Sequence, residues 1–178
     1  MRPRNDRLRR WALGLYEEHG PAIASIVGSE AVPPIRVEVA IDGPGAAWTN
    51  DDVVTLNARW FAEHPDDVGG CLHEFAHAIM RAPTYDDTTG WLIEGVADHV
   101  RNVLGFEMSW TAAHFEPGGA TAGYQTTAHF LAWLEASRPG IVRELSRRLS
   151  KGTYAQRDFE ELAEEPLPRL VAMYEEAN

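Results

Sequence analysis

Residues 65–80 read PDDVGGCLHEFAHAIM, and this stretch decides the fold. Pro65, Asp66 and Asp67 form a helix-start signal. Apolar residues then recur at steps of three and four, which is the period of an amphipathic helix. The pattern predicts a helix that ends near Met80 and packs through the apolar positions Val68, Cys71, Leu72, Phe75 and Ile79.

The same helix carries the run HEFAH at residues 73–77. Two histidines four positions apart share one face of a helix, so both imidazoles can reach one ion. The glutamate after the first histidine can reach a water bound there. The spacing therefore predicts the arrangement of zinc hydrolases, with His73 and His77 as ligands and Glu74 as general base.

A second apolar helix is predicted over residues 91–104, and it carries Glu94 and Asp98. A catalytic zinc commonly has three protein ligands and one open position, and Glu94 can supply the third ligand. Asp98, on the same face, can accept the second N–H of a ligand imidazole. The alternative is that both are solvated helix charges, but the apolar residues around them favour the metal site.

The rest of the chain predicts an α+β fold. A first helix begins at Asn5 or Asp6 and stops at Gly20-Pro21. Alternating residues 35–41 and the short runs 46–49 and 53–56 predict strands. Further helices are expected near residues 124–137, 140–150, 157–164 and 168–176. We expect one domain over residues 1–178, with 1–30 as a helical extension and a small antiparallel or mixed sheet packed on the HEFAH helix.

Charge and composition exclude several classes of partner. The 178 residues hold 16 basic and 27 acidic side chains, a net charge of −11, which argues against nucleic acid and anionic membranes as partners. No stretch approaches the roughly 18 apolar residues of a membrane span. The first sixteen residues lack the apolar core of a signal peptide, so we expect a cytoplasmic protein, with secretion as the alternative if a leader has been removed. The single cysteine, Cys71, is expected to be a core thiol, and nothing in the sequence indicates an oligomeric state.

Five segments resemble one known family. The run GWLIEGVADHVR at 90–101, together with HEFAH, is similar to the signature of the basic secretory protein family of plants and bacteria, zinc metallopeptidases of the gluzincin type. Later segments of that family resemble GYQTTAHFLAWL at 123–134 and GTY at 152–154, and AAWT at 46–49 resembles its strand before the metal helix. The similarity spans roughly residues 35 to 175.

The resemblance implies a zincin fold, with an edge strand beside the metal helix, and peptide hydrolysis as the activity. Carried over residue by residue, it implies that His73, His77 and Glu94 bind one zinc ion per chain and that Glu74 is the base. This chain departs from the family's name, because it is acidic and begins without a recognisable leader.

Several other side chains have two interpretations each. Tyr124 is a candidate to stabilise the oxyanion of the reaction, because a phenol near a metal can donate to developing negative charge. His114 and His129 compete with it for that role, and all three can instead be ordinary core or surface residues. Arg101 can bind a substrate carboxylate or pair with Asp98.

These patterns together predict a zinc-dependent peptidase whose backbone near residues 46–48 pairs with an extended substrate by strand addition. A binding module with a structural zinc is the alternative from another class. A fully buried site would indicate that module, whereas an open cleft would indicate the enzyme. A metal-dependent hydrolase of non-peptide amides is a third possibility.

Overall fold

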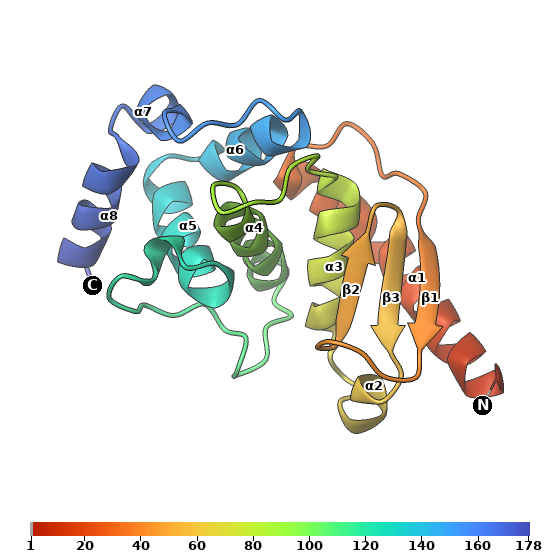
Figure 1. The fold of residues 1–178 in the computed structure, drawn as a ribbon. Coiled ribbons are helices and arrows are strands. Elements are labelled where there is room, and N and C mark those ends of the chain that lie inside the picture. The colour runs from red at the N-terminus through yellow and green to blue at the C-terminus, as the bar shows by residue number, and fades with distance from the viewer. Residues whose placement is uncertain (1) are drawn as a thin grey trace.

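The computed structural model describes residues 2–178, and its strands all lie in the first third of the chain (Figure 1). This is the α+β arrangement that the sequence predicts, although the short helices α2 and η1 are not predicted. None of the described helices is long and apolar enough to cross a membrane. The elements are α1 (Arg2–Val27), β1 (Arg36–Ala40), β2 (Ala47–Asn50), β3 (Val53–Asn57), α2 (Trp60–Glu63), α3 (Val68–Met80), α4 (Gly90–Val103), η1 (Gly119–Thr121), α5 (Tyr124–Ser137), α6 (Ile141–Ser150), α7 (Asp158–Ala163) and α8 (Leu167–Glu176).

The sheet is mixed and has the strand order β1-β3-β2. β1 runs parallel to β3, with Val37 opposite Val54, and β2 runs antiparallel to β3, with Trp48 opposite Thr55. A tight turn joins β2 to β3, and Asp51 in that turn has a left-handed backbone with φ 53°, which aspartate tolerates better than most residues. Because β2 stands last in the strand order, it is an edge strand. It packs against α3.

Helix α3 lies at the centre of the molecule, between the sheet and the helices α4–α8 (Figure 1). Eleven of its thirteen residues are buried, which is typical of a helix surrounded by other elements. The Asp67 side chain accepts a hydrogen bond from the Gly70 N–H and caps the first turn. Arg81 ends the helix in a left-handed conformation. The predicted helix over residues 68–80 is confirmed.

The prediction that the first helix stops at Gly20-Pro21 is wrong, because α1 continues to Val27 with Pro21 inside it. A proline inside a helix costs about 3 kcal/mol, since it cannot donate a backbone hydrogen bond. Ile23 and Val27, in the turns that follow, are fully buried. Burying one such side chain contributes roughly 1.5–3 kcal/mol, so the two together outweigh the proline.

Helix α1 packs along the side of α3. The Tyr16 ring meets the Phe75 ring edge to face at a centroid distance of 5.0 Å, and its hydroxyl donates to the Pro33 carbonyl at 2.6 Å. Ala12, one turn earlier, is fully buried. α1 thus supports the helix that carries the HEFAH run.

Helices α4 and α5 pack closely against each other. Gly95 allows this approach, because a Cβ added there would lie 2.1 Å from Thr127 Cγ2 and 2.7 Å from Thr127 Cβ. The pair brings the beginning of α5 beside the middle of α4, so Tyr124 and Glu94 line the same cleft.

We expect Gly95→Ala to destabilise the protein by about 1–3 kcal/mol, because the added methyl overpacks the contact with Thr127. Urea unfolding measures the change. Gly14→Ala is the matched control: Gly14 lies in α1 with no atom near its added Cβ, and removing a helical glycine stabilises by roughly 0.5–1 kcal/mol. Equal stability of Gly95→Ala and the wild type would contradict the close helix contact.

Candidate metal centre

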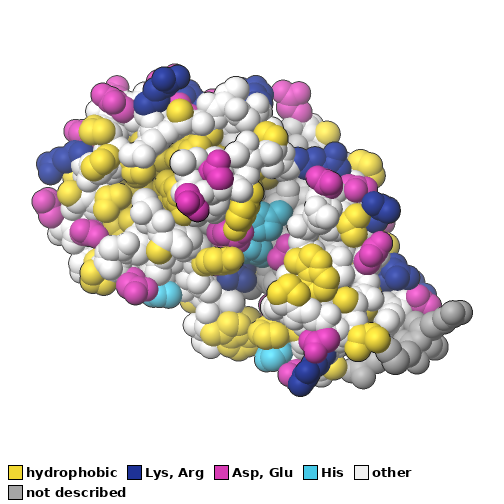
Figure 2. Space-filling view, in the orientation of Figure 1, with side chains coloured by type: hydrophobic (Ala, Val, Ile, Leu, Met, Phe, Trp, Pro, Cys, Tyr) yellow, Lys and Arg dark blue, Asp and Glu magenta, His cyan; other side chains and the backbone are white. Residues whose placement is uncertain are grey.

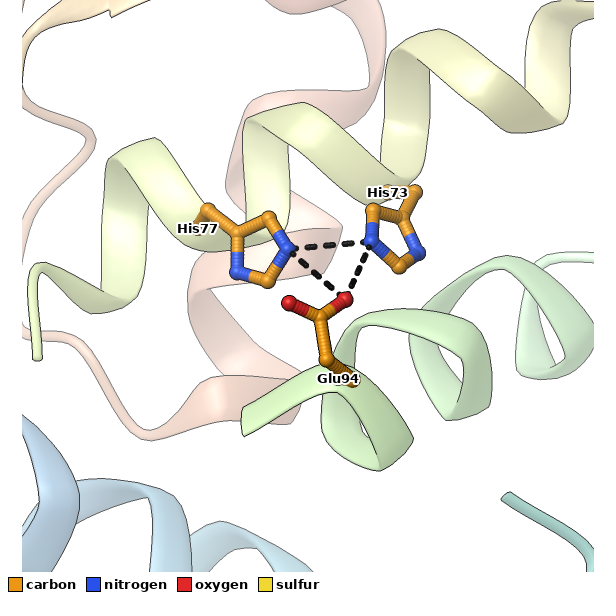
Figure 3. Close-up of side chains that lie close together, drawn as sticks. All are labelled: His73, His77 and Glu94. Atoms are coloured by element: carbon orange, nitrogen blue, oxygen red, sulfur yellow. Dashed lines mark hydrogen bonds and ion pairs between the residues drawn. The ribbon is translucent and has the colours of Figure 1, made fainter. Parts of the chain in front are cut away.

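The two histidines of α3 face the same side of the helix, as their spacing predicts (Figure 3). Their ring centroids are 4.7 Å apart, and their Nε2 atoms are 3.0 Å apart. Both side chains are largely buried, His73 more than His77. One turn of α3 therefore brings two imidazole nitrogens to one point.

Helix α4 brings Glu94 to that point from the opposite side (Figure 3). Its Oε2 lies 3.1 Å from His73 Nε2 and 3.5 Å from His77 Nε2. One ligand atom from each of the three residues lies within 4.8 Å of the others. His73, His77 and Glu94 could thus hold one metal ion.

Asp98 follows Glu94 by one turn of α4 and is fully buried. Its Oδ1 lies 2.6 Å from His73 Nδ1, which donates to it. Arg101, one turn further, places a guanidinium nitrogen 2.8 Å from the same oxygen. Of the two interpretations of Arg101, the structure shows the pairing with Asp98. The chain from Arg101 through Asp98 to His73 orients the imidazole, so its Nε2 points at the metal position.

The nitrogen and oxygen atoms that meet at this point need a proton or a cation between them. Because His73 Nδ1 donates to Asp98, a neutral His73 presents a lone pair at Nε2. That lone pair faces His77 Nε2 and Glu94 Oε2, and such acceptors repel one another unless a proton or a cation lies between them. A metal ion satisfies all three acceptors at once, so the donor set fits a metal.

The pKa values of His73 and Glu94 are shifted by the same contacts. Burial alone would lower the pKa of His73, but its hydrogen bonds to Asp98 and Glu94 outweigh burial and raise the pKa to about 10. Burial alone would raise the pKa of Glu94, but its hydrogen bonds with His73 and His77 reverse this effect and hold the pKa far below its usual range. Glu94 is therefore a carboxylate at neutral pH, as a metal ligand must be.

Glu74 points from α3 toward the edge strand β2. The hydroxyl of Thr49 lies 2.8 Å from Glu74 Oε2 and 3.0 Å from the Glu74 carbonyl oxygen. With Thr49 beside Oε2, the carboxylate has a defined orientation and its Oε1 remains available as an acceptor. Glu74 is not among the three residues whose atoms converge on the metal position.

Two tyrosines lie on the solvent side of the ligands. The Tyr124 ring stacks on the His73 ring at a centroid distance of 6.0 Å, and its backbone is left-handed, with φ 49°. The Tyr85 hydroxyl donates to Glu94 Oε1 at 2.7 Å. Burial and the carboxylates of Glu94, Asp98 and Glu74 raise the pKa of Tyr124. Both phenols therefore carry their protons at neutral pH and can donate hydrogen bonds.

His73, His77 and Glu94 line a cleft of about 1280 Å³ between β2, α3 and α4. In Figure 2, histidine atoms are visible in a hollow near the middle of the molecule, with acidic atoms beside them. The cleft runs along the whole of β2 and is also lined by Glu74, Tyr85, Arg101 and Tyr124.

Two predicted candidates, His114 and His129, lie elsewhere. His129 contacts the Tyr174 hydroxyl at 2.8 Å, and His114 is exposed beside Glu116; neither lines the cleft. Cys71 is fully buried, as expected of a core thiol.

Sequence reasoning missed two residues of the site, Thr49 and Tyr85. Thr49 lies on the predicted edge strand, and the alternation of side chains along that strand is a signal that could have placed it toward α3. Tyr85 lies in the loop between α3 and α4, where no periodicity applies. Only its position nine residues before Glu94 could have drawn attention to it.

Comparison with family models relates the chain to known proteins. Searches of curated proteins and of solved structures returned no match. A family model described as "Peptidase of plants and bacteria" matches residues 37–174, a region that contains β2, β3, all of β1 except Arg36, both histidines and Glu94. This confirms the resemblance seen in the sequence. The match covers more than half of the chain, and the protein therefore belongs to this family of peptidases of plants and bacteria.

Proposed function

We propose that the protein is a zinc-dependent metallopeptidase that hydrolyses peptide bonds, with a zincin-type fold. His73, His77 and Glu94 would hold one zinc ion, because two imidazoles and one carboxylate are a common donor set of catalytic zinc. When bound, zinc polarises a carbonyl oxygen and lowers the pKa of water. The observation that carries the proposal is that the three ligand atoms converge at the wall of an open cleft.

Glu74 would act as the general base. It lies on the cleft one residue after a metal ligand, and Thr49 orients its carboxylate. From there it can accept a proton from the attacking water and later deliver it to the leaving nitrogen. The hydrogen bond from Thr49 leaves one oxygen of Glu74 free for this exchange.

Tyr124 would donate to the oxyanion that develops on the substrate carbonyl. Its phenol remains protonated, its ring lies over His73, and it lines the cleft. Its left-handed backbone also supports a functional role, because strained non-glycine residues concentrate at active sites. His114 and His129 lie outside the cleft, so this role falls to Tyr124.

The edge strand β2 would bind the substrate backbone. The Asn57 N–H bonds to the Ala46 carbonyl, and in an antiparallel pair the direction of these bonds alternates along the strand. The backbone groups of Ala47 and Thr49 therefore point away from β3, toward the cleft. An extended peptide can add to them as a further strand.

A peptide-library digest tests the proposal. Zinc-loaded wild type is expected to cut a subset of peptides, a chelator to abolish the cuts, and added zinc to restore them. Glu74→Gln protein purified in parallel is the control, because cuts that appear equally in its digest come from contaminating peptidases. A protein that binds zinc stoichiometrically but cuts no peptide would instead support the binding module with a structural zinc.

Asp98→Asn is expected to keep the fold and to weaken zinc binding by roughly 10- to 100-fold, because it removes the charge that orients and polarises His73. Competition with a coloured chelator measures the affinity. Asp158→Asn is the matched control: Asp158 is also a buried aspartate paired with an arginine, Arg148 at 2.8 Å, but it lies outside the cleft. Unchanged zinc affinity in Asp98→Asn would contradict the role given to Asp98.

A further inference from the structure

The two oxygens of Glu94 have different partners. Oε2 faces His73 and His77, whereas Oε1 accepts the hydrogen bond from Tyr85 at 2.7 Å. A carboxylate has two oxygens that can both bind one cation. The short hydrogen bond from the Tyr85 phenol holds Oε1 away from the cation, so that both oxygens cannot bind it together.

The exposure of Tyr85 shows that packing does not explain its position. The residue is 64% exposed, so burial of its ring contributes little, yet its hydroxyl reaches a carboxylate that is only 8% exposed. At the cleft, the hydroxyl of Tyr85 donates a hydrogen bond to Glu94.

The loop that carries Tyr85 holds the ring in place. The Asp86 carboxylate accepts hydrogen bonds from the Thr88 N–H, the Thr88 hydroxyl and the Thr89 N–H. The ring lies against Gly90, where an added Cβ would be 3.4 Å from two of its carbons. The loop thus aims the phenol at Glu94 before any substrate arrives.

We propose that Tyr85 is a positioning residue that restricts Glu94 to one-oxygen coordination of the metal. The inference rests on the proposed metal site. A catalytic zinc needs a coordination position that protein ligands do not fill. Without the phenol, Glu94 Oε1 can turn to the ion and occupy that position. Tyr85 acts through Glu94, and its exposed ring forms part of the cleft rim.

Binding of a small anion to the metal tests this inference without any peptide cleavage. In cobalt-loaded protein, azide binding at the open position changes the visible absorption. Tyr85→Phe is expected to retain the metal and to bind azide roughly 10- to 100-fold more weakly, the range for losing a hydrogen bond to a charged group. In the infrared, the separation between the two carboxylate stretches of Glu94 should narrow as coordination changes from one oxygen to two.

Two further variants sharpen the test. Asp86→Ala keeps the phenol but releases the loop, so azide binding should weaken in the same direction by a smaller factor. Tyr154→Phe, which removes a phenol outside the cleft, should bind azide as the wild type does. Unchanged azide binding and an unchanged infrared separation in Tyr85→Phe would overturn the proposal, as would loss of the metal. A wild type that binds metal and azide but cuts no peptide would refute the peptidase and leave the role of Tyr85 intact.

Discussion

Glu74→Gln is expected to retain one zinc per chain and to lose peptide hydrolysis by a factor of roughly 10² to 10⁴, the usual contribution of a general base. Glutamine keeps the shape of the side chain and its contact with the Thr49 hydroxyl, but it cannot accept a proton from water. Because Glu74 lies outside the convergent set of ligand atoms, the metal should stay.

The measurement is paired. Zinc stoichiometry and the turnover of a peptide cut by the wild type are determined on the same preparation. Glu63→Gln, in the short helix α2, is the control and should match the wild type in both. Zinc loss in Glu74→Gln would make Glu74 a ligand. Retained zinc with full activity would remove it from the mechanism.

His77→Ala and His73→Ala are each expected to lower the zinc content from about one per chain to nearly none after dialysis. Losing a ligand should cost more than the roughly 10- to 100-fold loss expected for a hydrogen-bond partner of a ligand. His129→Ala is the control, because His129 is half-buried beside Tyr174 and lies outside the cleft.

Thermal unfolding gives a second measure of the same site. A ligand that binds only the folded state stabilises it by about 2.7 kcal/mol at a concentration one hundred times its Kd. Zinc should therefore raise the Tm of the wild type and of His129→Ala, and leave the Tm of His77→Ala unchanged. If both histidine variants kept their zinc, the metal would have to be bound elsewhere.

Local signals in the sequence were sufficient for the centre of the fold. The cap at Asp67 and the apolar period place α3, and the four-residue spacings on α3 and α4 place two histidines, Glu94 and Asp98 on facing surfaces. These relations depend on helix geometry, which a few residues determine.

The errors and omissions arise where distant parts of the chain decide the structure. Pro21 is a stop signal in isolation, but burial of Ile23 and Val27 outweighs it. Thr49 reaches Glu74 across 25 positions. Tyr85 reaches Glu94 from a loop whose path depends on how α3 and α4 pack, so no local pattern specifies the contact.

Helix α1 has a practical consequence for how the protein can be shortened. The family match begins at residue 37, whereas α1 ends at Val27. A fragment trimmed to the matched residues would lose Ala12, Tyr16 and Ile23, and it would open the rear surface of α3 to water. The start of the family match therefore lies after a helix that packs into the core, and a truncation series should retain that helix.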